Sequence, residues 1–272
     1  MRGQDVAEIR AGAEAIDMQE EGSHGALLLH GFGDTPQTLA RLATRLHAAG
    51  YGVYAPLLPG HGRTMAAFRK SNADEWADAA TAAFRQVRSR HRSVSVVGLS
   101  MGGALAVALT ARVQDVRALA LIAPYIEMPG TIRAAAATHW LWGRFAGEIS
   151  AQNPRSIRDP IEREKSLAYG SVTGSALYQL LKVVRRARKS LADVKAPTLL
   201  IQSREDPRCS PEGAERAMKL LGAREKKLVW TEGAGHVITV DYGRERVYTE
   251  VQAWLDAHTR GGAAAAADSA AT

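Results

Sequence analysis

The chain has 272 residues and carries 35 basic and 28 acidic side chains, which gives a net charge of +7. Its 46% apolar and 23% charged residues are ordinary for a soluble globular protein, and the length suits one large domain with an insertion or at most two domains. The single cysteine, Cys209, excludes an internal disulfide. The basic residues accompany no known nucleic-acid-binding motif, so we expect no nucleic-acid partner.

The start of the chain and its longest uncharged stretch bear on location. Residues 1–5 lack the apolar core of a secretory signal. Residues 93–111 are uncharged and approach the length of a membrane span, but their alternating character predicts a strand followed by a buried helix. We therefore expect a cytoplasmic protein.

Apolar runs and amphipathic segments alternate along most of the chain. Residues 1–25 are polar and predict an edge strand or a loose arm. Short apolar runs typical of buried parallel strands lie at residues 26–30, 52–56, 93–99, 118–123, 195–201 and 226–230. Helical segments are predicted at residues 36–49, 74–90, 211–221 and 242–258. This alternation predicts an α/β fold whose mostly parallel sheet is covered by helices on both faces.

One region interrupts the alternation. No convincing strand is found between Pro124 and Leu191, where an apolar cluster at residues 140–145 precedes an amphipathic helix that contains Leu177 and Leu181. An insertion placed after the carboxyl end of a strand lies over the crevice where α/β sheets bind ligands. We expect a core of residues 1–124 and 192–260, a small helical cap of residues 125–191, and a disordered alanine-rich tail of residues 261–272.

The sequence Gly98-Leu99-Ser100-Met101-Gly102 joins an apolar strand to a segment of small residues with helical character. In this setting Gly-x-Ser-x-Gly is typical of a nucleophile elbow, a strained turn that lifts the serine Oγ clear of the sheet. Side chains at Gly98 or Gly102 would collide with the neighbouring strand or helix. We predict Ser100 as a nucleophile and the N–H of Met101, at the start of the helix, as an oxyanion donor.

An activated serine needs a base, and the base needs an acid that orients it. In folds with this elbow the chain order is serine, then acid, then histidine. Among the histidines after Ser100, His236 lies in a glycine-rich loop between the last strand and the last helix, where it can reach back over the sheet. Glu205 and Asp206 both follow the preceding strand, and we favour Asp206 because Pro207 would fix the turn after it.

A second oxyanion donor is expected in a loop after an early strand. His30-Gly31-Phe32-Gly33 forms such a loop, and its glycines let the backbone bend toward a substrate, so the N–H of Phe32 is the predicted donor. His30 and His61 are expected to brace loops rather than to react. The histidines lack zinc-ligand spacing, so we expect no metal and no cofactor.

These motifs, in this order, resemble the bacterial carboxylesterase and monoacylglycerol lipase group of the α/β-hydrolase fold. The resemblance runs from about residue 25 to 258 and rests on residues 28–32, 59–62, 98–103, 197–199, 206 and 235–241. The Gly-His-Val-Ile-Thr run that contains His236 is the most group-specific of them. The resemblance implies an intracellular esterase with a small cap and a preference for single-chain acyl esters. It assigns the catalytic triad to Ser100, Asp206 and His236, and the oxyanion hole to Phe32 and Met101.

The implied reaction is hydrolysis of a carboxylic ester through an acyl-enzyme intermediate, as in a carboxylesterase or a monoacylglycerol lipase. The same triad also serves thioesterases, carbon–carbon bond hydrolases and cofactor-free haloperoxidases, and the fold alone does not separate them. A protein that only binds a small ligand on a hydrolase fold is a further alternative. Dehalogenase and epoxide hydrolase chemistry is disfavoured, because those enzymes use an aspartate where Ser100 stands.

The positions of the cap and loops indicate which residues line a substrate pocket. The basic residues of the cap bear on contact with a lipid surface. The apolar side chains expected to line an acyl pocket are Phe32, Met128, Trp140, Leu141, Trp142 and Val237. Basic residues gather at Lys182, Arg185, Arg186, Arg188 and Lys189. This cluster predicts a solvated helix face or weak contact with an anionic lipid surface. A monomer and a homodimer both remain open.

Overall fold

The computed structural model describes residues 8–20, 22–143 and 145–259, so the tail expected at residues 261–272 lies outside the described residues. A seven-stranded sheet has the order β1-β3-β2-β4-β5-β8-β9, and β1 pairs antiparallel with β3 while the other pairs are parallel. The strands are β1 (Ile16–Met18), β2 (His24–Leu29), β3 (Gly52–Ala55), β4 (Ser93–Leu99), β5 (Leu119–Ile122), β8 (Thr198–Ser203) and β9 (Lys226–Thr231). The expected mostly parallel sheet is confirmed, with β1 as an edge strand near the amino terminus.

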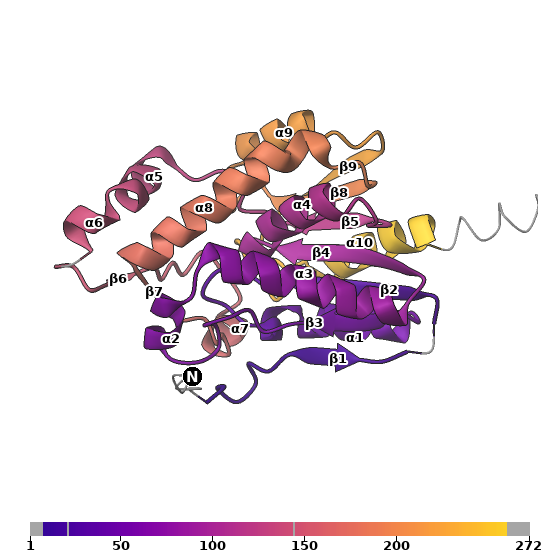
Figure 1. Ribbon diagram of the computed structural model, residues 1–272, viewed down its shortest axis with the longest axis horizontal. Coiled ribbons are helices and arrows are strands. Elements are labelled where there is room, and N and C mark those ends of the chain that lie inside the picture. Colours follow the sequence, from indigo (N-terminus) through magenta and orange to yellow (C-terminus); the bar gives the residue numbers. More distant parts are fainter. Residues whose placement is uncertain (1–7, 21, 144, 260–272) are drawn as a thin grey trace, which may run out of the picture.

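Helices cover both faces of this sheet (Figure 1). The helices that contribute to the apolar cluster on one face are α3 (Ala73–Arg90), α4 (Met101–Val113), α8 (Gly174–Ser190) and α9 (Pro211–Leu220). Those on the other face are α1 (Ala40–Ala48) and α10 (Arg244–Thr259). Successive strand residues face opposite clusters, as Leu27 and Leu28 of β2 show. Because both faces are buried, the strands are continuous apolar runs in the sequence.

The ends of the predicted helices follow from local chemistry. Helix α3 begins with a capping box, in which the Asn72 side chain accepts the N–H of Glu75 at 3.1 Å and Glu75 accepts the N–H of Asn72 at 3.3 Å. The helix expected at residues 36–49 is a 3-10 turn, η1 (Pro36–Leu39), followed by α1. Gly50, with φ of 85°, ends it as the sequence predicts.

The insertion between β5 and β8 is mainly helical but holds a small second sheet. Its helices are α5 (Gly130–Ala137), α6 (His139–Trp142), α7 (Pro160–Glu164), α8 and η2 (Leu191–Asp193). The expectation that this region has no strand is wrong, because β6 (Glu148–Ser150) pairs antiparallel with β7 (Ser171–Thr173). Each strand has three residues, and the long connection over residues 151–170 carries no hairpin signal. Helices α5 and α6 project away from the main sheet (Figure 1).

The amphipathic helix expected around Leu177 is confirmed as α8, which packs along α4 and buries its leucines. Three of its basic residues form ion pairs within the chain, namely Lys182–Asp74 at 3.2 Å, Arg186–Asp74 at 2.5 Å and Arg188–Glu127 at 3.6 Å. Much of the basic cluster is therefore paired with acidic groups. A short helix, α2 (Met65–Lys70), precedes α3. Among the described residues, no helix combines the length and the apolar character needed to cross a membrane.

Candidate active site

Ser100 lies on a sharp turn between β4 and α4. Its backbone has φ of 54° and ψ of −117°, a conformation that non-glycine residues rarely adopt. The Ser100 N–H donates to the carbonyl of Ile122, in β5, at 3.0 Å. Its carbonyl accepts the N–H of Ala104 at 3.2 Å and the N–H of Tyr125 at 3.0 Å. These bonds hold the strained turn between the sheet and α4.

Two glycines make this turn sterically possible. A Cβ on Gly98 would lie 2.4 Å from the carbonyl oxygen of Gly102, and a Cβ on Gly102 would lie 2.0 Å from the carbonyl oxygen of Leu29 in β2. Cβ atoms essentially never approach another atom so closely. The collisions expected from the sequence are confirmed, and they involve backbone atoms that cannot rotate away.

Three side chains from distant parts of the chain form one hydrogen-bonded series. The Oγ of Ser100 lies 2.7 Å from Nε2 of His236, and Nδ1 of the same ring lies 2.8 Å from Oδ2 of Asp206. Asp206 follows β8 and His236 follows β9, so parallel strands deliver all three residues to the same edge of the sheet. All three are buried. With Nδ1–H donating to Asp206, Nε2 is free to accept the serine proton.

The carboxylate of Asp206 has donors on both oxygens. Oδ1 accepts the N–H of Arg208 at 2.7 Å and of Cys209 at 3.0 Å, and Oδ2 accepts from Nε2 of Gln202 at 2.8 Å as well as from His236. Burial acts to raise the pKa of Asp206. The charge and hydrogen bond of His236, together with the two backbone N–H groups, outweigh burial, so this pKa lies below its ordinary value.

Glu205, the other acid that the sequence left open, has different partners. Its carboxylate forms an ion pair with Arg158 of the insertion, and Oε1 accepts the N–H of Gly233 at 3.2 Å. Its side chain is 40% exposed, whereas the side chain of Asp206 is fully buried. The structure therefore brings Asp206, and not Glu205, to His236.

One group of side chains near this series has the composition of a metal site. Ligand atoms of Asp206, Cys209 and His236 lie within 4.8 Å of one another. Burial raises the pKa of the Cys209 thiol well above its ordinary value, so the sulfur stays protonated. Nδ1 of His236 is already engaged with Asp206. Since a metal needs a thiolate and a free ring nitrogen, these residues do not fit a metal centre.

One expected oxyanion donor, Met101, directly follows Ser100, and the other, Phe32, belongs to the loop that passes beside it. The Phe32 N–H, in the loop after β2, makes no hydrogen bond within the described part of the chain. Met101 is the first residue of α4, where an N–H has no acceptor inside the helix. A Cβ on Gly31 would lie 3.5 Å from Cβ of Ser100, so the loop passes directly beside the serine. Both N–H groups are therefore available to an oxygen bound at Ser100.

His30 and His61 are buried, and each ring bonds a backbone carbonyl close to it in the chain, of Gly31 and Pro59 respectively. Nδ1 of His30 lies 2.9 Å from the carbonyl of Gly31, and Nε2 accepts the N–H of Leu58 at 3.1 Å. The rings of His30 and His61 pack edge to face with centroids 5.0 Å apart. Burial lowers the pKa of His30 to about 4, so the ring is neutral at neutral pH. These contacts agree with the bracing role expected from the sequence.

A second buried carboxyl, Asp34, lies beside the serine, and sequence reasoning missed it. Oδ2 of Asp34 and Cβ of Ser100 both lie within 4 Å of the position that a Cβ on Gly31 would take. Oδ2 accepts the hydroxyl of Thr38 at 2.8 Å, whereas Oδ1 is buried without a hydrogen-bond partner among the described residues. Burial raises the pKa of Asp34 to about 6. The only signal in the sequence is an acidic residue two positions after Phe32, and its burial cannot be read there.

The six residues expected to line an acyl pocket do not come together. Met128 is buried, and Phe32 and Trp142 pack against the same apolar cluster, which also contains Met101. Val237 packs against the cluster on the other face of the sheet. Three of the six therefore belong to the apolar cluster on one face of the sheet, and a fourth belongs to the cluster on the other face.

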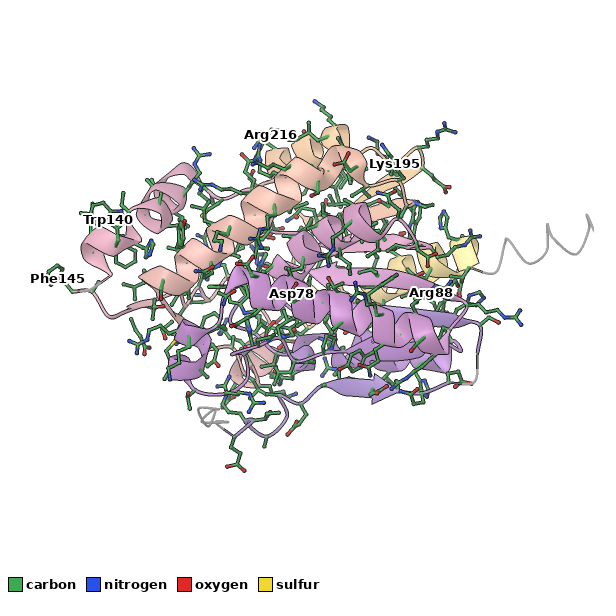
Figure 2. The ribbon with its side chains drawn as sticks, viewed as in Figure 1. Asp78, Arg88, Trp140, Phe145, Lys195 and Arg216 are labelled. Atoms are coloured by element: carbon green, nitrogen blue, oxygen red, sulfur yellow. The ribbon has the colours of Figure 1, made fainter. Side chains whose placement is uncertain are left out.

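The remaining two, Trp140 and Leu141, are 64% and 53% exposed. Figure 2 shows Trp140 and Phe145 at the outer end of the insertion. Trp140 lines a cavity of about 730 Å³ between α2 and the insertion. The other lining residues are Met65, Ala66, Arg69, His139, Gly143, Gly147, Glu148, Thr173, Gly174 and Ser175. Ser100, Asp206 and His236 are not among the residues that line this cavity.

Comparison with known proteins identifies a matching family and relatives that align over most of their length. The sequence matches the Hydrolase_4 family, described as serine aminopeptidase, S33, over residues 24–242. A thermostable monoacylglycerol lipase from Bacillus sp. strain H-257 is 28% identical over 239 residues, which cover 88% of this chain and 92% of the relative. A carboxylesterase from Bacillus subtilis strain 168 is 24% identical over 237 residues, covering 86% of this chain and 93% of the relative.

Solved structures agree with the observed fold. One from work on two metagenome-derived lipolytic enzymes, LipS and LipT, is 31% identical, covers 92% of this chain and all of the other, and superposes with a TM-score of 0.85. A monoacylglycerol lipase from Paleococcus ferrophilus, at 22% identity, covers 90% of this chain and 98% of the other with a TM-score of 0.77. The resemblance noted from the motifs is confirmed. The chain belongs to the Hydrolase_4 (serine aminopeptidase, S33) family and has the α/β-hydrolase fold.

Proposed function

We propose that the protein hydrolyses carboxylic esters of single acyl chains, as a carboxylesterase or monoacylglycerol lipase does. The observation that carries this proposal is the series of hydrogen bonds from Ser100 through His236 to Asp206 at a strained elbow. Such a series removes the serine proton while Oγ attacks a carbonyl carbon. Relatives named as a monoacylglycerol lipase and a carboxylesterase support an ester as the substrate.

The proposed reaction uses the same groups twice. Ser100 Oγ attacks the ester carbonyl while His236 Nε2 takes its proton, and the N–H groups of Phe32 and Met101 bind the oxyanion. His236 gives this proton to the leaving alcohol, which leaves an acyl ester on Ser100. His236 then takes a proton from water, which attacks the acyl ester, and returns it to Ser100 as the carboxylic acid leaves. Loss of one oxyanion donor typically costs about 3–4 kcal/mol of transition-state stabilisation.

The proposal is tested with a series of p-nitrophenyl esters from acetyl to palmitoyl, together with a monoacylglycerol. Wild-type protein is expected to hydrolyse part of the series, and Ser100→Ala to lose at least about 10³-fold in kcat because the nucleophile is missing. Turnover that survives in Ser100→Ala would contradict the proposal. So would well-folded wild type that hydrolyses no ester, and thioester, carbon–carbon bond and ligand-binding assays would then follow.

The acyl chain is proposed to lie against Phe32, Met128 and Trp142, which share an apolar cluster with Met101. Trp142→Ala is expected to shift the preferred acyl length, because it removes a wall of this environment. Ile161→Ala, which changes a 62% exposed residue of α7, is the matched control and should leave the profile of kcat/KM unchanged. An unchanged profile in Trp142→Ala would contradict this part of the proposal.

We also propose that α8 makes weak contact with anionic lipid. The protein is proposed to be cytoplasmic and to be a monomer or a homodimer. It is supported by the basic residues Arg185 and Lys189, which lie near the carboxyl end of α8. Binding to anionic vesicles is expected to weaken as salt is added, because salt screens exposed charges. Binding that ignores lipid charge and salt would contradict this contact.

A further inference from the structure

The segment that carries His236, residues 234–237, is called the base loop here. Three consecutive backbone N–H groups hold it. The N–H of Gly235 donates to Oδ2 of Asp241 at 2.7 Å, and the N–H groups of His236 and Val237 both donate to the carbonyl of Ser156 at 2.9 Å. Ser156 belongs to the insertion, and Asp241 lies after the base loop. Groups outside the base loop therefore set the backbone direction at His236.

Asp241 connects the base loop to the insertion through both of its oxygens. Oδ2 also accepts the N–H of Arg158 at 2.9 Å. Oδ1 accepts the N–H of Asp159 and the N–H of Tyr242, both at 2.9 Å. The residue is fully buried, so four backbone N–H groups, including that of Gly235, stabilise its charge. Each oxygen accepts two hydrogen bonds, which leaves little freedom for the carboxylate to move.

Residues 151–159 of the insertion, called the strap here, pack closely against both loops of the site. A Cβ on Gly235 would lie 1.9 Å from a carbonyl oxygen of the strap, so this position accepts no side chain. On the other side, Arg208 of the acid-bearing loop donates through Nε to Oγ of Ser156 at 3.1 Å, and its guanidinium also contacts the carbonyl of Ala151. The strap thus links the loop that carries the acid to the loop that carries the base.

We propose that Asp241 is a positioning residue, which together with the strap fixes the base loop so that Nε2 of His236 stays within reach of Ser100 Oγ. This inference rests on the proposed role of His236 as the base. Catalysis depends steeply on such geometry, since a misplacement of about 1 Å can cost about 100-fold in rate. Asp241 acts through the residue before His236 and does not contact the substrate.

The variant Asp241→Asn tests the inference with little change in shape. An amide nitrogen replaces one accepting oxygen and then faces two N–H donors, so one of the two pairs of hydrogen bonds is lost. We expect kcat for a short soluble ester to fall about 10- to 100-fold, with KM changed less than about threefold, because the base and not the acyl site is displaced. Rates are expressed per active site titrated with a fluorophosphonate that labels Ser100.

Asp115→Asn is the matched control for the change from a carboxylate to an amide. Asp115 lies between α4 and β5, outside the strap and the base loop, and its side chain is 63% exposed. Its carboxylate pairs with Arg88 at 2.8 Å, and an exposed ion pair contributes little to stability. The kcat of this control is expected to stay within about twofold of wild type.

A milder variant covers the case in which Asp241→Asn does not fold. Ser156→Ala removes the hydrogen bond from Arg208 that anchors the strap but keeps the carbonyl that holds the base loop. We expect the same change in a weaker form, a fall of a few-fold in kcat with KM unchanged. If Asp241→Asn does not fold and Ser156→Ala keeps the kcat of wild type, the inference is overturned.

A spectroscopic signature separates positioning from simple stabilisation of the fold. The low-field proton resonance of His236 Nδ1–H, identified by its loss in His236→Ala, is expected to shift or broaden in Asp241→Asn and to stay unchanged in Asp115→Asn. A lower melting temperature with wild-type kcat per labelled site and an unchanged resonance would overturn the inference. This resonance needs no ester, so a wild type that hydrolyses no ester would overturn the proposed function alone.

Discussion

Two buried aspartates lie near Ser100, in the loops after β2 and β8, and their surroundings differ. Asp206 has hydrogen-bond donors on both oxygens, and its pKa lies below the ordinary value. Asp34 has the Thr38 hydroxyl on Oδ2 and no partner among the described residues on Oδ1, and burial raises its pKa to about 6. Burial acts to raise both pKa values, but at Asp206 the charge and the hydrogen bond of His236, together with two backbone N–H groups, outweigh it.

This difference separates a carboxyl that can orient a base from one that cannot. Asp206 meets Nδ1 of His236 at 2.8 Å, and an ionised acceptor there stabilises the imidazolium that forms when the ring takes a proton. Asp34 lies near the same serine, but its hydrogen bond goes to Thr38 at the start of the helical segment after the loop. Proximity to the nucleophile is therefore a weaker guide to role than the set of donors around a carboxyl.

The largest effect is expected for Asp206→Asn, with a loss of about 10⁴-fold in kcat. The backbone N–H groups of Arg208 and Cys209 would keep the amide oxygen, so the NH₂ group would face Nδ1 of His236. The ring would then carry its proton on Nε2 and could not accept one from Ser100. Steady-state kinetics measure the loss, and Asp34→Asn is the control. An equal loss of kcat in Asp34→Asn would contradict the claim that the two aspartates have different roles.

A smaller effect, on stability, is expected for Asp34→Asn. Because the folded pKa is about 6 and the ordinary value is 3.8, the folded protein binds more protons between these pH values, and wild-type stability falls as pH rises through this window. Asparagine does not titrate and can still accept from Thr38. The variant should match wild type near pH 4 and exceed it by at most about 3 kcal/mol near pH 8. Urea unfolding at both pH values measures the gap, and a gap independent of pH would contradict the account.

The smallest effect is expected for Gln202→Leu, which removes one donor from Oδ2 of Asp206. A hydrogen bond to a charged group contributes about 1.5–3 kcal/mol. Because His236 and two backbone N–H groups still bond Asp206, only part of this is lost, and kcat should fall by at most about tenfold while the fold is kept. Glu205→Gln is the matched control, because its side chain is partly exposed and does not contact His236. Wild-type kcat in Gln202→Leu would show that the remaining donors suffice to hold Asp206 ionised.

Much of the sheet and of the hydrogen-bonded series could be predicted because local patterns carry them. The strand before Ser100 is a continuous apolar run, and Gly98 and Gly102 stand where only glycine fits. Chain order then pointed to Asp206 and His236, since parallel strands deliver their carboxyl ends to one edge. These features depend on residue type at fixed spacing, which is what a sequence displays.

The insertion and the supports of the site depend on contacts that leave no local pattern. Strands β6 and β7 have three residues each and pair across a long connection. The carbonyl of Ser156 holds the base loop, and any residue type has a carbonyl. The exposure of Trp140 and the burial of Asp34 depend on how the insertion and the loop after β2 pack. No spacing in the sequence could have indicated them.

The most direct test of the central claim is the capture of an acyl group on Ser100. Wild type is mixed with p-nitrophenyl butyrate, quenched during the first turnover, and analysed by mass spectrometry of its peptides. The account predicts one butyryl group on the peptide that contains Ser100 and none on the same peptide of Ser100→Ala. Release of p-nitrophenolate at the wild-type rate without an acylated Ser100, or an acyl group on another residue, would contradict it.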